Sequence, residues 1–167
     1  AQQLQLDPVT SQIVGNAFRE LQFHALALEH EDEAGQALEG IVRARLAQGE
    51  VDKAIKVTKQ ITDNLWFGRA MMSISDHFAE AEMVSEALAY LDRAQVRIDQ
   101  APETVERSEA YTALAIKRAR LGNLQGGIDA AQKIADPSSR VDALQEMANT
   151  YQRAAGYNKK ARQAAAK

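Results

Sequence analysis

The residues best suited to chemistry are histidines with acids nearby. His24 precedes the acidic run EHEDE, which spans Glu29–Glu33 and contains His30. Imidazole and carboxylate groups are common metal ligands. Two ligands on one helix face usually stand four residues apart, whereas these two histidines are six apart. We therefore expect the acids to begin a helix, where the helix dipole favours them, and we expect no bound metal or cofactor.

His77 beside Asp76 is the other pair that could move a proton. An acid–base pair needs a placed nucleophile or substrate group, and the sequence provides none. Phosphate-binding glycine motifs and nucleophile motifs are also absent from the sequence. The chain has no cysteine, which excludes disulfides, thiolate metal sites and cysteine nucleophiles. We predict that the protein is not an enzyme.

Composition and charge indicate a single folded domain. Of the 167 residues, 46% are apolar and 26% are charged, a balance typical of globular proteins. The net charge of −3 argues against a generic nucleic-acid-binding protein, which needs a basic face. No apolar run reaches transmembrane length.

After Glu146 the chain has basic residues, the first of them Arg153, and no acids. The basic end could contact an anionic membrane surface peripherally or an acidic partner, and stabilisation of a helix C-terminus is the alternative role. This end comprises Lys159, Lys160, Arg162 and Lys167.

A pattern of two helices around a turn residue organises most of the chain. Gly49 and Gly122 occupy the turn in two clear copies, and Glu82 and Ala155 occupy it in two weaker ones, at spacings of 33, 40 and 33 residues. A period of this length is typical of helical solenoids. The second copy has seven extra residues near 96–106, which lengthen a helix or a loop. The predicted helix pairs are 33–48 with 51–62, 65–81 with 84–98, 102–121 with 124–135, and 137–154 with 157–165.

The N-terminal segment fits this repeat poorly. Asp7-Pro8 predicts a helix start, since Asp caps free N–H groups and Pro suits the first turn. The helix should continue to about Glu29 and cap the first open face of the array. We therefore divide the chain into an N-terminal extension with a capping helix, residues 1–32, and a repeat domain, residues 33–167.

The copies resemble tetratricopeptide repeats, units of 34 residues with bulky residues in the first helix and small ones in the second. Tyr111 and Leu114 match the first-helix positions, while Ala54, Ala87 and Gly127 match small second-helix positions. The resemblance implies an all-α fold, a right-handed α-solenoid of about four helix–turn–helix repeats.

In that family the first helices line a concave groove that binds a protein or peptide. Glu39 and Arg43 stand where members that grip a terminal carboxylate carry Lys and Asn, so we do not expect chaperone-tail binding. A solvated face is the alternative role for the charged residues. The candidates that the resemblance implies are Glu39, Arg43, Arg69, Met72, Asp76, Thr112, Ile116 and Arg120.

Trp66 and Phe67 form the one adjacent aromatic pair of the sequence. Aromatic side chains anchor interfaces disproportionately, so an exposed Trp66 would be the leading partner-binding candidate. The alternative is a hydrophobic staple beside a helix start. Phe67 also stands where the third and fourth copies have Arg107 and Arg140.

These patterns favour a non-catalytic protein–protein interaction module, a scaffold or an assembly subunit of a larger complex. The alternative is a structural homo-oligomer that assembles through its terminal repeats. The N-terminal sequence Ala1-Gln2-Gln3 suits either signal-peptide cleavage or a trimmed chain. With the missing cysteines it favours a bacterial envelope protein, periplasmic or secreted, while a cytoplasmic location stays open.

Overall fold

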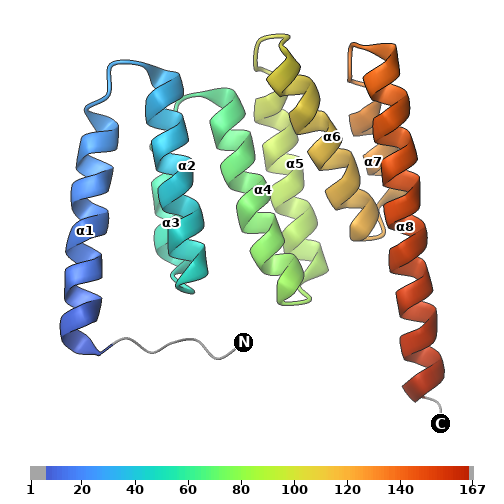
Figure 1. The fold of residues 1–167 in the computed structure, drawn as a ribbon, viewed down its shortest axis with the longest axis horizontal. Helices are drawn as coiled ribbons and strands as arrows, with labels where there is room; N and C mark the ends of the chain where they lie inside the picture. The colour runs from blue at the N-terminus through green and yellow to red at the C-terminus, as the bar shows by residue number, and fades with distance from the viewer. Residues whose placement is uncertain (1–6, 166–167) are drawn as a thin grey trace.

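The computed structural model describes residues 7–165, with side chains to residue 156, and this range is all-helical. In chain order the helices are α1 (Pro8–Leu26), α2 (Glu31–Ala47), α3 (Val51–Thr58), α4 (Asn64–Glu80), α5 (Val84–Ile98), α6 (Val105–Arg120), α7 (Leu124–Ala131) and α8 (Pro137–Ala165). Figure 1 shows α1, α2, α4, α6 and α8 along one row, with α1 and α8 at opposite ends, and it shows α3 behind α2 and α7 partly behind α8.

Three helical hairpins, α2–α3, α4–α5 and α6–α7, form the middle of this row (Figure 1). The first helix of each hairpin packs against the first helix of the next, and α6 packs against α8 in the same way. Each second helix also contacts the helix that follows it. Leu38, Ile74, Leu91 and Leu114 are almost completely buried along the row, so one apolar core joins the three hairpins.

The predicted turn residues end the first helix of each hairpin. Gly49, Glu82 and Gly122 have φ values of 73°, 61° and 85°, the left-handed conformation that reverses a helix end. In each case the N–H of the following residue bonds a carbonyl in the last turn of the helix, for example Asn123 to Arg118 at 2.9 Å. The turn prediction is confirmed at these three positions.

The fourth predicted turn is wrong. Ala155 lies inside α8, which is one continuous helix from Pro137 to Ala165 and not two helices separated near Tyr157. Alanine is the strongest helix former, and neither Ala155 nor the adjacent Gly156 adopts the left-handed φ that ends a helix. After α1 the described residues therefore form three hairpins and a final single helix, not four hairpins.

The seven extra residues of the second copy lengthen a helix. α5 has 15 residues, whereas α3 and α7 have eight each. The loops that follow these helices are short in every case, so the longer α5 accounts for the irregular spacing.

Small residues allow close helix contacts at the predicted positions. Ala54, Ala87 and Gly127 are buried early in α3, α5 and α7. A Cβ atom on Gly127 would lie 2.9 Å from the Ala115 carbonyl oxygen and 2.8 Å from the Met147 sulfur. The alanine preferred at this position in tetratricopeptide repeats would therefore require one of these neighbours to move.

Most predicted helix starts are confirmed. Asp7 and Asp136 cap α1 and α8, and hydrogen bonds from Thr10 and Ser139 lower the pKa of these carboxyl groups. α2 begins at Glu31 within the acidic run, so the expected boundary between residues 32 and 33 falls inside its first turn.

Several helix boundaries differ from the prediction. α1 ends at Leu26 rather than near Glu29, α3 ends at Thr58 rather than at 62, and α7 ends at Ala131 rather than at 135. α6 begins at Val105 rather than at Pro102, because the Thr104 hydroxyl accepts a hydrogen bond from the Arg107 N–H at 3.2 Å and so caps the helix there.

Candidate functional site: a groove across the first helices

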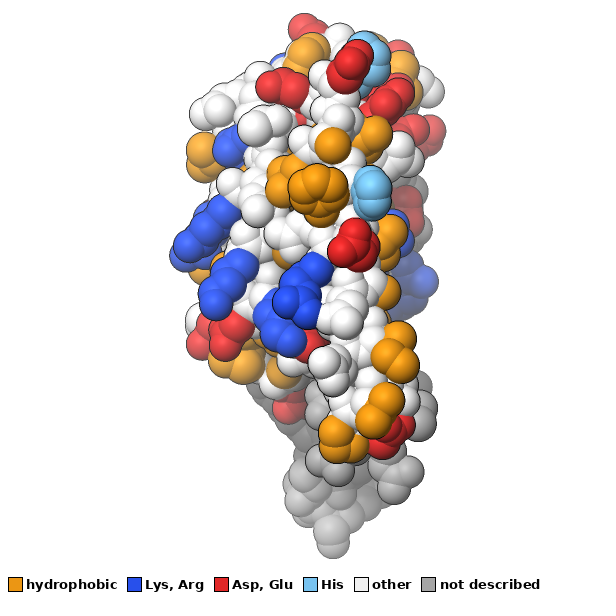
Figure 2. Space-filling model, turned by 90° about the vertical axis from the view of Figure 1, so that its left-hand side faces the viewer, with side chains coloured by type: hydrophobic (Ala, Val, Ile, Leu, Met, Phe, Trp, Pro, Cys, Tyr) orange, Lys and Arg blue, Asp and Glu red, His pale blue; other side chains and the backbone are white. Residues whose placement is uncertain are grey.

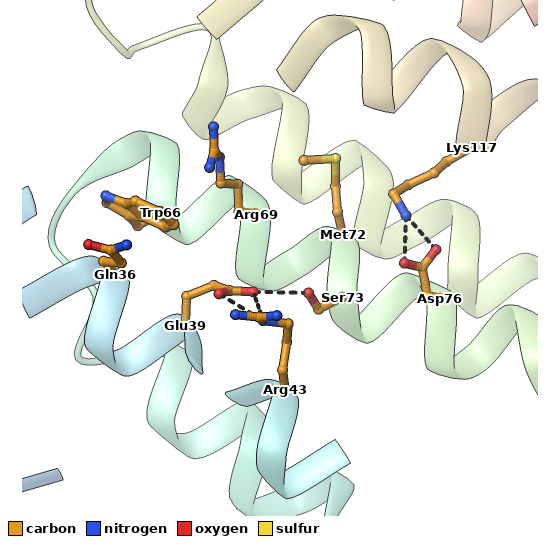
Figure 3. Close-up of a pocket in the computed structure, with 9 residues that line it drawn as sticks. All are labelled: Gln36, Glu39, Arg43, Trp66, Arg69, Met72, Ser73, Asp76 and Lys117. Carbon is orange, nitrogen blue, oxygen red and sulfur yellow. Dashed lines mark hydrogen bonds and ion pairs between the residues drawn. The ribbon is translucent and has the colours of Figure 1, made fainter. Parts of the chain in front are cut away.

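An open hollow of about 390 Å³ lies across α2, α4 and α6 (Figure 3). These are the first helices of the three hairpins, and their side-by-side packing forms its floor. Six of the ten candidate residues line it, namely Glu39, Arg43, Trp66, Arg69, Met72 and Asp76, together with Gln36, Ser73 and Lys117.

Glu39 anchors the middle of the groove although its side chain is only 7% exposed. Arg43, one turn later on α2, places its Nε atom 2.9 and 3.0 Å from the two carboxylate oxygens. Ser73 on α4 donates its hydroxyl to the same carboxylate at 3.2 Å (Figure 3). The buried charge is thus neutralised, and it links the first two hairpins.

Trp66 forms one end of the groove and is half-buried, not fully exposed. It packs over Gly35, where an added Cβ would lie 2.9 Å from the indole. Its Nε1 donates to Asp32 at 2.6 Å, and the Arg69 guanidinium lies over its ring, 4.7 Å from the centroid. Trp66 therefore packs between α2 and α4, and the part of its side chain that stays exposed lines the groove.

The opposite end of the groove joins α4 to α6. Lys117 donates to both carboxylate oxygens of Asp76, at 2.5 and 2.6 Å (Figure 3). A second contact between α4 and α6 lies nearer Trp66, where Glu109 is 3.8 Å from Arg69. A second, smaller hollow next to Arg43 and Asp76 continues the groove towards His77 and Glu80.

The other four candidate residues do not line the groove. Thr112, Ile116 and Arg120 lie on α6 outside it, and the Thr112 hydroxyl bonds to the Ser108 carbonyl of its own helix at 3.1 Å. Phe67 lies instead against Arg97 of α5, whose guanidinium is 4.4 Å from the ring centroid.

The position of Phe67 explains why the second copy lacks an arginine there. Arg107 and Arg140 reach back to carbonyl oxygens of the loops before their helices, Ala101 and Ile134, at 2.8 and 3.0 Å. At the α3–α4 loop, Arg97 binds the Thr62 carbonyl at 2.9 Å from the other side while it covers Phe67. The loop carbonyl is thus satisfied without an arginine at position 67.

Lys117 lines the groove but is not among the ten candidate residues. It directly follows the candidate Ile116, and the candidates on this helix stand one to a helical turn. The adjacent pair Met72 and Ser73 lines the groove from α4, so the groove face is two residues wide. Two adjacent positions per turn of α6 could therefore have been considered, and these would have included Lys117 beside Ile116.

The described residues contain no group of three or more histidines and acids placed to hold a metal ion. In the same range, no helix has both the length and the hydropathy needed to cross a membrane. The side chains of Lys159, Lys160, Arg162 and Lys167, which carry the predicted membrane contact, lie outside the described residues. Comparisons with protein-family models, with curated protein sequences and with solved structures return no match to this chain.

Proposed function

We propose that this chain is a non-catalytic binding module, a short right-handed α-solenoid of tetratricopeptide-like hairpins that holds a protein or peptide partner as a scaffold or assembly subunit. The observation that carries the proposal is the groove across α2, α4 and α6, to which three successive hairpins contribute side chains. A surface of this kind needs the hairpins stacked together and does not exist in one hairpin alone.

The groove is also preorganised. The pairs Glu39–Ser73, Asp32–Trp66 and Asp76–Lys117 each join neighbouring first helices. A partner that binds there would order few side chains of the array, and this lowers the entropic cost of association.

Affinity capture followed by mass spectrometry tests the proposal, with purified partner then titrated against each variant. Trp66→Ala and Arg43→Gln should each weaken binding of the captured partner about tenfold or more, as expected for interface anchors. Arg93→Gln is the matched control, because Arg93 is exposed on α5 and lies over Tyr90 away from the groove. A partner that binds all three folded variants as well as the wild type would contradict the groove.

A second candidate function, self-association, is favoured by the outer face of α1. A helix that caps a repeat array should be polar on its outer side. Here large apolar side chains are 41–68% exposed on α1 and just after it, and Figure 2 shows apolar side chains along this end of the molecule. They are Val9, Ile13, Leu21, Phe23, Leu26 and Leu28.

The two ends of the array differ, and this bears on how copies would meet. Among the described side chains of α8, Val141 is the one large apolar residue that is strongly exposed. End-to-end stacking would place the apolar α1 face against this polar helix. Pairing of two α1 faces about a twofold axis buries apolar surface on both sides and closes the assembly as a dimer.

Sedimentation equilibrium distinguishes the two functions. If self-association is the function, the wild-type chain should show a concentration-dependent dimer mass, and Ile13→Glu with Phe23→Glu should give a monomer. A folded wild type that stays monomeric at high concentration excludes self-association and leaves the groove as the functional surface.

A further inference from the structure

The groove has a charge asymmetry that identifies the chemistry of its partner. Resting on the proposed function, we propose that the groove binds an extended peptide segment through an acidic side chain of that segment, held between Arg43 of α2 and Arg69 of α4. Both arginines line the same hollow, from neighbouring helices (Figure 3).

Arg43 presents most of its guanidinium to the groove. Its side chain is 66% exposed, and Nε is the atom that contacts Glu39. The two terminal amino groups make no hydrogen bond within the part of the chain that the structure describes. A guanidinium held at Nε keeps its outer N–H groups directed away from that contact, which is the geometry suited to a carboxylate.

Arg69 is positioned by stacking and not by hydrogen bonds. Its guanidinium lies over the Trp66 ring, 4.7 Å from the centroid, and it makes no hydrogen bond with the described residues. Glu109 forms a loose ion pair with it at 3.8 Å and is 66% exposed. The ring holds the guanidinium beside the groove, and its N–H groups can bind a ligand in place of Glu109.

The acids that line the groove are already neutralised. The Glu39 carboxylate is buried and bound by Arg43 and Ser73, so it adds little negative charge at the surface. Both oxygens of Asp76 are bound by Lys117. Among the residues that line the groove, its Trp66 end therefore has two cations, Arg43 and Arg69, and no unpaired carboxylate. Glu109, which lies beside the lining and is exposed, pairs loosely with Arg69, and a negative group in the groove would compete with it.

The lining also favours an extended peptide over the apolar face of a helix. Met72, the one aliphatic residue among the lining side chains, is 5% exposed, so it offers little surface to an apolar partner. Trp66 is the one other apolar contact, and Gln36 beside it supplies an amide that can bond a peptide backbone (Figure 3).

Selection from a displayed library of random peptides tests this inference. The peptides are fused through their C-termini, so acidic side chains are the carboxylates they offer. The baits are the wild-type protein, the Arg43→Gln/Arg69→Gln variant and the Arg93→Gln control, each first shown to be folded by circular dichroism. We expect the wild type and the control to enrich peptides with Asp or Glu at one fixed position, and the double variant to lose that preference.

A selected peptide is then synthesised with its acid or the matching amide, and with a free or an amidated C-terminus. Replacing the acid with the amide should weaken binding about 10- to 100-fold, the range expected for a hydrogen-bonded charge. Enriched peptides without an acid, or a preference unchanged in the double variant, overturn the inference and leave a groove for another peptide class. An effect confined to the free C-terminus overturns it in favour of terminal-carboxylate binding. If the folded wild type enriches no peptide, the peptide groove itself is wrong.

Discussion

At the residue scale, the most consequential contact is the pair Glu39–Arg43, because one member is buried and the other is exposed. The carboxylate has 7% of its side chain exposed and the guanidinium 66%. Removing the exposed partner leaves a buried charge with one hydroxyl contact, from Ser73. Such a loss destabilises a protein more than the loss of a surface ion pair.

We therefore predict that Arg43→Gln lowers the free energy of unfolding by about 1–2 kcal/mol, below the cost of breaking a fully buried pair because Arg43 is solvated. Adding Glu39→Gln should recover most of this loss, since the amide has no charge to leave unpaired. Urea denaturation of the two single variants and the double variant measures the coupling. Strictly additive effects of the two substitutions would contradict the interpretation, and Arg93→Gln should change stability little.

Single residues also show which parts of the groove could be predicted from the sequence and which could not. Glu39 and Arg43 share a face of one helix, and Arg69 and Asp76 share a face of another. The resemblance to tetratricopeptide repeats implied that both faces line one groove. The bond from Trp66 to Asp32 joins two helices 34 residues apart, and no local pattern encodes it.

At the element scale, the hairpin turns account for both the success and the failure of the predicted architecture. A turn was predicted from one residue, and it formed wherever that residue is left-handed, including the non-glycine Glu82. Ala155 has the right spacing but no such conformation, and α8 continues through it. Spacing therefore predicts where a turn could occur, but residue type alone does not decide whether it does, since Glu82 is left-handed and Gly156, next to Ala155, stays in the helix.

Glu82 and Gly122 occupy corresponding left-handed turn positions with different residue types, so opposite substitutions at the two positions can be compared. Glu82→Gly should stabilise the protein by roughly 0.5–1 kcal/mol, because glycine adopts positive φ without the Cβ penalty. Gly122→Ala should destabilise it by about 1 kcal/mol for the same reason. An added Cβ at Gly122 meets nothing within 4 Å, so no clash complicates the result. Equal and small effects in thermal and urea unfolding of both variants would contradict this account of the turns.

At the scale of the whole molecule, each helix contacts only its neighbours along the row. α4 packs against α2, α3, α5 and α6, whereas α1 packs against α2. In arrays built from nearest-neighbour contacts, the stability of a segment follows the number of neighbours it has, and terminal segments open first.

We predict that amide hydrogen exchange is slowest in α4 and α6, which have four neighbouring helices each, and fastest in α1, with α8 protected most where it packs on α6 and α7. The sequence could not predict this order, because it depends on how the hairpins stack and not on local helix propensity. Native-state exchange followed by mass spectrometry, at several protein concentrations, measures it. Uniform protection across all helices would contradict nearest-neighbour stacking. Protection that rises with protein concentration in α1 alone would instead indicate that two copies pair through that face, because only a bound second copy gives the terminal helix a further neighbour.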